Sequence, residues 1–203
     1  MAAASWRQQI KDLNKKEVLK PFSLQKIFKT ISDLLGPTIP EIAFLDLNAK
    51  YQYTLFAGEI LRPRWKFYGI VPSETREKLP LERSRGNVKV VDLQRISSIG
   101  HPPIHCMFNY WTRLNPQELI QSFRLAVLTN VELFIIPKAG ILKDLIKLCC
   151  VTTVVVLNFD RSRTELCFFE IKDKLSETQR VAVLTWCNQF LIDHQERNIA
   201  LVF

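Results

Sequence analysis

The sequence predicts a mixed α/β protein of the α+β class, in which an antiparallel meander in the first half joins a helix-flanked mixed sheet in the second half. Apolar and polar residues alternate through much of positions 42–71, as in strands with one buried face. From position 115 onward, strand patterns alternate with capped helix patterns, which is typical of a sheet covered by helices. Since 47% of the 203 residues are apolar, the chain can bury a substantial core.

The first half begins with a basic arm, residues 1–22, which precedes a single α+β domain over residues 23–203. Ser23 caps a helix whose apolar residues recur every three or four positions, and Gly36-Pro37 ends it. Alternation then predicts three strands, at 42–47, 51–61 and 65–71. A polar, charge-rich stretch at 73–87 follows and is a candidate internal boundary of the domain.

In the second half, strands are expected at 88–96 and 105–112. The residues Asn115, Pro116 and Glu118 supply an N-cap, an N1 proline and an N3 carboxylate for a helix that runs to Asn130. A strand at 131–136, a helix at 141–149 and a pair of strands within 151–172 come next. Ser176 and Gln179 form a second capping box for a helix to about residue 195, and residues 199–203 could add an edge strand.

The formal charge of +8 is concentrated in the first half of the chain. Residues 1–95 hold 17 Lys and Arg against 10 Asp and Glu. Such a bias favours a polyanionic partner, either nucleic acid or an acidic lipid surface. The candidate nucleic-acid contacts lie in the arm and in a segment that interleaves cations with aromatics: Lys11, Lys15, Lys16, Lys20, Arg62, Arg64, Trp65 and Lys66. The alternative for the second segment is a strand with Trp65 in the core and its cations in solvent.

Several classes of protein are disfavoured by what the sequence contains. Five irregularly spaced cysteines and a charged N-terminal stretch predict an intracellular protein with reduced thiols. The longest uncharged apolar stretch, residues 148–159, is too short to cross a bilayer. No Gly-x-Gly-x-x-Gly or Gly-x-x-x-x-Gly-Lys sequence occurs, so a glycine loop that cradles a nucleotide is not predicted. His101, His105 and Cys106 lack the second ligand pair of a zinc site.

Paired chemical groups stand at the end of the second strand of the 151–172 pair. Because strand side chains alternate, Glu170 and Lys172 should project from one face while Ile171 turns into the core. A carboxylate that can bind a divalent cation, beside an ammonium that can steady water or phosphate, suits metal-dependent phosphodiester cleavage.

This arrangement resembles the core of the PD-(D/E)xK nuclease superfamily over about 40 residues. The resemblance implies that Glu170 binds Mg²⁺, that Lys172 positions the attacking water, and that an Asp from the preceding strand completes the metal site. Asp160 is the candidate for that third residue, but it falls in the hairpin turn. From the rise per residue of a strand, it would lie roughly 20 Å from Glu170. The nuclease scaffold would then be inactive, or another acidic residue would complete the metal site.

Two functions follow as hypotheses. The first is a basic intracellular protein that binds nucleic acid on a nuclease-like scaffold, with Mg²⁺ as cofactor if it is active. The second is a non-enzymatic assembly or adaptor protein, such as a viral matrix-like or accessory factor or a subunit of a larger complex. Such a protein would use protein partners or self-association together with its basic arm.

Overall fold

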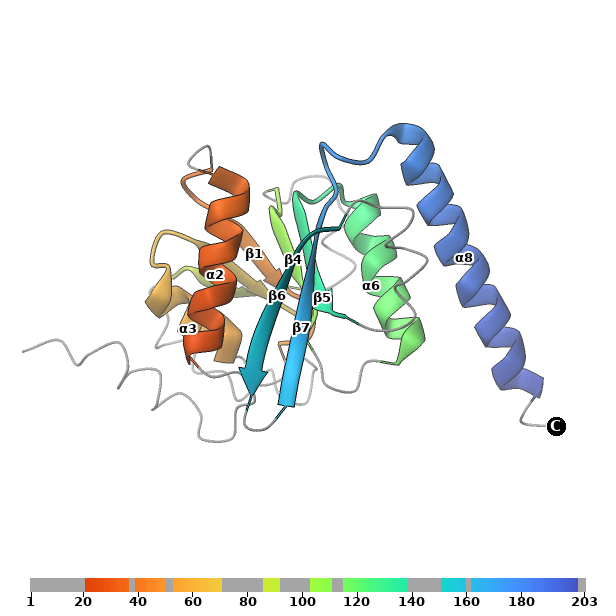
Figure 1. Ribbon diagram of the computed structural model, residues 1–203, viewed down its shortest axis with the longest axis horizontal. Helices are drawn as coiled ribbons and strands as arrows, with labels where there is room; N and C mark the ends of the chain where they lie inside the picture. The colour runs from red at the N-terminus through yellow and green to blue at the C-terminus, as the bar shows by residue number, and fades with distance from the viewer. Residues whose placement is uncertain are drawn as a thin grey trace, which may run out of the picture.

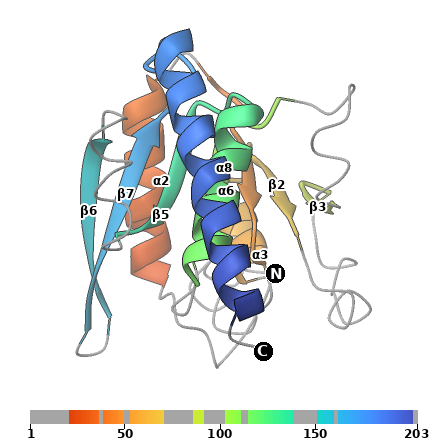
Figure 2. The same ribbon diagram turned by 90° about the vertical axis from the view of Figure 1, so that its right-hand side faces the viewer.

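The computed structural model describes residues 21–36, 39–49, 53–70, 86–91, 103–110, 115–138, 151–159 and 162–200. Within these ranges the chain forms a seven-stranded sheet in the order β3-β2-β1-β4-β5-β7-β6. Helices α2 and α3 cover one face of the sheet, and α6 and α8 cover the other (Figures 1 and 2). The elements are α2 (Pro21–Leu35), β1 (Ala43–Asp46), α3 (Tyr53–Leu61), β2 (Lys66–Gly69), β3 (Val88–Val90), β4 (Cys106–Phe108), α6 (Pro116–Leu128), β5 (Leu133–Pro137), β6 (Val151–Phe159), β7 (Ser162–Glu170) and α8 (Glu177–Ala200).

The strands of the first half are parallel, so the predicted antiparallel meander is wrong. β1 pairs in parallel with β2 on one side and with β4 on the other, while β3 and β5 extend the parallel part outward. Only β7 and β6, the last two strands along the described chain, run antiparallel to their neighbours. The prediction of a mixed, helix-flanked sheet is confirmed at this coarser level.

The error arose at α3, which was predicted as a strand over residues 51–61. The helical residues from Thr54 through Glu59 are all buried, so α3 shows no polar stripe at the helical period. A short segment buried on all sides cannot be assigned to helix or strand from periodicity alone. Parallel β1 and β2 need a crossover connection, and a helix is its usual form.

Alternate residues along the strands belong to two hydrophobic cores, one on each face of the sheet. Phe44 of β1, Phe67 of β2 and Phe168 of β7 pack with α2 and α3 in the first core. Leu45, Phe134 and Phe169 face the opposite way and pack with α6 and α8 in the second. A sheet buried on both faces explains why its strands are short apolar runs in the sequence.

Both predicted capping boxes are confirmed. Asn115 Oδ1 accepts from the Glu118 amide at 2.7 Å, and the Ser176 amide donates to Gln179 Oε1 at 3.0 Å. The predicted strands at 42–47, 65–71 and 131–136 also lie where expected. The first predicted helix is present as well, but it begins at Pro21, so Ser23 lies in its first turn and is not its N-cap. Residues 199–200, predicted to begin an edge strand, belong to α8. The segments 1–20, 73–85 and 141–149 lie outside the described residues, as do Lys11, Lys15, Lys16 and Lys20.

Candidate functional site

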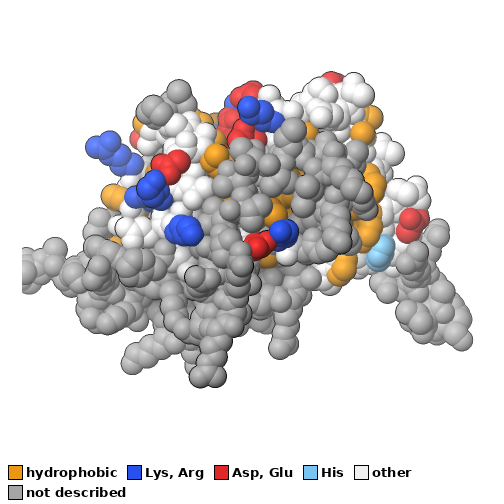
Figure 3. All heavy atoms as spheres, in the orientation of Figure 1, with side chains coloured by type: hydrophobic (Ala, Val, Ile, Leu, Met, Phe, Trp, Pro, Cys, Tyr) orange, Lys and Arg blue, Asp and Glu red, His pale blue; other side chains and the backbone are white. Residues whose placement is uncertain are grey.

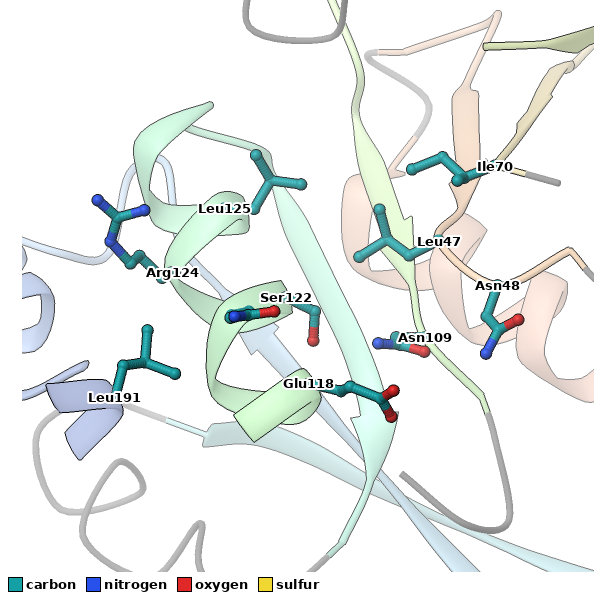
Figure 4. Close-up of a pocket in the computed structure, with 10 residues that line it drawn as sticks. Leu47, Asn48, Ile70, Asn109, Glu118, Ser122, Arg124, Leu125 and Leu191 are labelled. Carbon is teal, nitrogen blue, oxygen red and sulfur yellow. The ribbon is translucent and has the colours of Figure 1, made fainter. Parts of the chain in front are cut away.

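A cavity of about 530 Å³ opens at the carboxyl ends of β1 and β4. β2 and β3, the next strands along the chain, lie on one side of β1 in the sheet. β4 and β5 lie on its other side, so the strand order reverses between β1 and β4. In open α/β sheets this position is where ligands bind, because the loops that follow the two strands diverge there. The cavity is lined by Leu47, Asn48, Ile70, Asn109, Glu118, Gln121, Ser122, Arg124, Leu125 and Leu191 (Figure 4).

The turn after β1 is fixed by hydrogen bonds within the protein. Three consecutive amides donate, Leu47 to Phe108 O at 2.8 Å, Asn48 to Asp46 Oδ1 at 2.9 Å and Ala49 to Ile70 O at 3.0 Å. Glycine-rich turns at this position bind ligand phosphates through such amides. Since the amides here are already engaged, this turn offers a ligand its side chains rather than its backbone.

Asp46 ends β1 beneath the cavity and is 3% exposed. Burial raises the pKa of its carboxyl from 3.8 to about 7, although hydrogen bonds from the Asn48 amide and the Thr54 side chain act in the opposite direction. The acid therefore ties the turn after β1 to the first turn of α3. Its buried position makes it a support of the site rather than a group that contacts a ligand.

Helix α6 supplies most of the polar side chains of the cavity wall. Glu118 is the N3 residue of the capping box in the first turn of α6, and its Oε2 accepts from the Asn115 amide at 3.4 Å. The Ser122 hydroxyl donates to Leu119 O at 2.8 Å, which leaves its oxygen able to accept. The Arg124 guanidinium is engaged with α8, since its Nε donates to Asn188 Oδ1 at 2.7 Å.

Asn109 follows β4 and is the most buried polar side chain of the cavity wall, with 5% of its surface exposed. Its amide N–H donates to Ile135 O at 3.0 Å, which holds the backbone beside β5. The side-chain Oδ1 has no hydrogen-bond partner. The oxygen itself is buried, so a ligand in the cavity could reach it only if the side chain turned.

The Glu170 and Lys172 pair lies at the end of the sheet opposite the cavity, beside the start of β5. Glu170 pairs with Leu133, the first residue of β5, and its carboxylate lies 3.8 Å from Lys174 Nζ. Lys172 Nζ donates to Glu132 Oε1 at 2.6 Å, and Ile171 is buried as expected. These contacts are ion pairs at a strand end. Asp160 lies outside the described residues, and within the described part of the chain no group of three metal-ligating side chains occurs.

The segment that interleaves cations with aromatics also lies away from the cavity, between the end of α3 and the start of β2. Trp65 is 5% exposed and packs on Phe28 at 5.4 Å between ring centroids, so it is a core residue and is not available for base stacking. Arg62 lies over the Trp65 ring at 5.8 Å. Lys66 pairs with Glu41 at 3.1 Å, and Arg64 is exposed. On the face shown in Figure 3, basic side chains are interspersed with acidic ones.

No protein-family model matches the sequence, and no curated protein matches it. Solved structures do match the fold. TrmK of M. capricolum, in complex with S-adenosyl-homocysteine, superposes with a TM-score of 0.56 at 13% identity, over 81% of this chain and 75% of that one. Human methyltransferase-like protein 13, also in complex with S-adenosyl-homocysteine, gives 0.52 at 15% identity, over 83% and 91%. A candidate RNA methyltransferase from Pyrococcus horikoshii gives 0.56 at 11% identity, over 83% and 98%.

These similarities correct the predictions made from the 151–172 segment. The matching structures are methyltransferases, not PD-(D/E)xK nucleases, so the resemblance was wrong, as was Mg²⁺ as the cofactor. The nuclease-like nucleic-acid binder and the assembly or adaptor protein both lose their support. None of the helices among the described residues is long and apolar enough to span a membrane. The chain has the same mixed α/β fold as these solved methyltransferase structures.

Proposed function

We propose that the protein is a methyltransferase that binds S-adenosyl-methionine in the cavity at the carboxyl ends of β1 and β4. The observation that carries this proposal is the position of the cavity. It lies where the strand order reverses, in a fold shared with two structures that contain S-adenosyl-homocysteine. Its volume is within the range of sites for small molecules and cofactors.

The chemistry of the cavity wall supports an adenosyl ligand over a phosphorylated nucleotide. Leu47, Ile70, Leu125 and Leu191 supply apolar surface, while Asn48 and Gln121 supply amide groups. Among the described residues that line the cavity, Glu118 is the only carboxylate and Arg124 is the only cation, and the Arg124 Nε donates to Asn188 on α8. Phosphate groups need several convergent donors, and the turn after β1 does not provide them. A ligand without phosphate groups therefore suits the described part of this wall.

The residues that follow β1 and β2 differ from those of a glycine-loop nucleotide site. Ala49 stands in the turn after β1 with its amide engaged, and Ile70 follows β2 where dinucleotide-binding folds place an acid for the ribose hydroxyls. Recognition of the adenosyl group would therefore rest on side chains that follow β1, β2 and β4 and on side chains of α6 and α8. When bound, S-adenosyl-methionine supplies an electrophilic methyl group, and the apolar residues of the wall would exclude water from it.

A nucleic-acid methyl acceptor is also proposed. The excess of 17 basic over 10 acidic residues in positions 1–95 supports a polyanionic substrate. A structural neighbour that is a candidate RNA methyltransferase points in the same direction. Binding to RNA should then weaken steeply between 50 and 200 mM salt, roughly 10-fold or more if several phosphates are contacted. Salt-independent retention of labelled RNA in a filter assay would contradict this part of the proposal.

Isothermal titration of the full chain with S-adenosyl-homocysteine tests the site. We expect binding with a dissociation constant between about 1 μM and 1 mM, the usual range for enzyme ligands, and weaker binding of ATP. Leu125→Trp should lower the affinity for S-adenosyl-homocysteine at least about 10-fold, because the larger ring fills the cavity.

Leu128→Trp is the matched control for this substitution. Leu128 lies on the same helix, is 53% exposed and does not line the cavity, so its replacement should leave the affinity unchanged. Circular dichroism would verify that both variants remain folded. If the wild-type chain does not bind S-adenosyl-homocysteine, or if Leu125→Trp binds it equally well, the proposed site is wrong.

A further inference from the structure

Arg124 is a cation in the cavity wall whose charge is not neutralised by the described part of the chain. It lies on α6, is partly buried and has one polar contact among the described residues, the bond from its Nε to Asn188 Oδ1 at 2.7 Å. Asn188 is uncharged. The carboxylate of the described cavity wall, Glu118, lies about 120° around the helix from Arg124. The positive charge of Arg124 is therefore open to a ligand.

The bond to Asn188 also fixes the direction of the guanidinium. Because Nε is engaged, the remaining N–H donors of Arg124 are those of Nη1 and Nη2, which form one planar edge. Since Asn188 accepts through Oδ1, its amide nitrogen faces away from Arg124 and adds a further donor at the same place. A planar guanidinium edge matches two oxygens of one phosphate or carboxylate group, with two parallel hydrogen bonds.

Arg180 on α8 shows how an arginine that serves only the packing of the two helices is bonded. Its Nη1 donates to Val127 O at 2.8 Å and its Nη2 donates to Asn130 Oδ1 at 2.7 Å, where α6 ends. Its Nε lies 3.8 Å from the Glu177 carboxylate. Both Nη groups of Arg180 are thus used within the protein. Arg124 has the reverse arrangement, in which Nε is fixed and the Nη groups are left for a ligand.

The position of Arg124 separates it from the place proposed for the cofactor. Figure 4 shows Arg124 and Leu191 on the side of α6 that faces α8, whereas Asn109 and Glu118 lie on the side that faces the strand ends. S-adenosyl-methionine carries no phosphate and is proposed at the strand ends. An anionic group at Arg124 would therefore belong to the methyl acceptor. A phosphodiester of RNA carries a single charge, which one guanidinium can bind without the several donors that a triphosphate needs.

We infer that Arg124 binds a backbone phosphate of an RNA methyl acceptor at the α8 side of the cavity, and that Asn188 is its positioning residue. This inference rests on the proposed function, and it names a residue by which the acceptor is held. The contact fixes where the RNA backbone crosses the cavity mouth, because contacts to phosphate set the register and orientation of a nucleic acid on a protein.

Binding of a short, labelled single-stranded RNA between about 50 and 200 mM salt tests the contact. Each phosphate contact to a single strand contributes about 0.7 to the slope of log affinity against log salt. Arg124→Gln should lower that slope by about 0.7 and the affinity in low salt by about 10-fold. Arg124→Lys keeps the charge but loses the planar edge, so it should keep the slope and bind several-fold more weakly.

Asn188→Leu tests the positioning role. It leaves the charge of Arg124 in place but removes the bond that directs the guanidinium, so the slope should stay near that of the wild-type chain while the affinity for RNA falls about 3-fold or more. The control for charge is Lys29→Gln. Lys29 is an exposed cation of α2, on the opposite face of the sheet, and its replacement should change neither the slope nor the affinity.

The outcomes separate this inference from the proposed function. A wild-type chain that does not bind S-adenosyl-homocysteine shows that the cofactor site is wrong, whatever the RNA measurements give. If S-adenosyl-homocysteine binds but RNA does not, or if Arg124→Gln behaves as Lys29→Gln does, the cofactor site stands and the phosphate contact is wrong. An equal loss of affinity for RNA and for S-adenosyl-homocysteine in Arg124→Gln would show that the residue only holds α6 against α8, which also overturns the inference. Thermal unfolding verifies that each variant is folded.

Discussion

Replacement of Asp46 by Asn should raise the free energy of unfolding at pH 8 by up to about 4 kcal/mol. Burial raises the pKa of the Asp46 carboxyl from 3.8 to about 7 in the folded protein. One pKa unit corresponds to about 1.4 kcal/mol, so a shift of this size makes the ionised form of Asp46 strongly unfavourable in the folded state. Asn has the same shape, cannot ionise, and its oxygen can still accept from the Asn48 amide.

The pH dependence of stability follows from the sign of this shift. Between about pH 4 and pH 7 the folded protein keeps a proton on Asp46 that the unfolded chain has released. The contribution of Asp46 to stability is therefore largest below pH 4 and is lost as the pH rises toward 7. His105 acts in the opposite direction below pH 6.5, because burial lowers its pKa and the folded state disfavours its protonation.

Urea unfolding of the wild-type chain and Asp46→Asn at pH 5 and pH 8 would measure the effect. Subtraction of the two proteins removes the contribution of His105, which is common to both. Asp33→Asn serves as control, since Asp33 is an exposed helical residue paired with Lys29 and should not alter the pH dependence appreciably. Equal pH dependence in the wild-type chain and Asp46→Asn would refute the role assigned to Asp46.

Gly58→Ala should lower the free energy of unfolding by about 2 kcal/mol, although alanine is the better helix former. A Cβ atom at Gly58 would lie 2.3 Å from Cε1 of Phe67, closer than two carbon atoms can approach. The Phe67 ring cannot turn away, because it is fully buried and packs on Phe28 and Phe44 with ring centroids 5.8 and 5.7 Å away. Helix α3 would have to move away from β2.

A double-mutant cycle with Phe67→Leu tests this mechanism. The smaller side chain removes the ring atoms that the new Cβ would meet, so Gly58→Ala should destabilise the Phe67→Leu protein by less than half as much as the wild-type protein. Unfolding free energies from urea titration give all four corners of the cycle. An equal loss in both backgrounds would show that the close approach of α3 to β2 is not the cause.

Local signals in the sequence predicted local structure well. The side chains of Asn115 and Ser176 bond to residues only three positions away, and such short-range patterns determine a helix start regardless of the rest of the fold. The strand that contains Phe44 was also predicted, because its apolar run is bounded by turn residues. The orientation of the strands was not predictable in this way, since it depended on whether residues 51–61 formed a helix or a strand.

The candidate site could not be assembled from the sequence for a related reason. Leu47 is far from Asn109 and Glu118 in the chain and meets them only if β1 and β4 are parallel neighbours. The rule that ligands bind at the carboxyl ends of such strands could have selected them, but the predicted meander placed no parallel pair there. The Glu170 and Lys172 pair drew attention instead, because its spacing is visible within three residues.

The reversed direction of β7 determines which part of the chain completes the cavity. Because β7 runs opposite to β5, its last residue lies beside the first residue of β5. Helix α8 then returns along α6 toward the end of the sheet where the cavity lies. Leu191 lies on that return path and forms part of the cavity wall. During synthesis on a ribosome, every strand of the sheet would therefore emerge before this wall exists, and a nascent chain that stops short of residue 191 would lack the part of the cavity wall that α8 supplies.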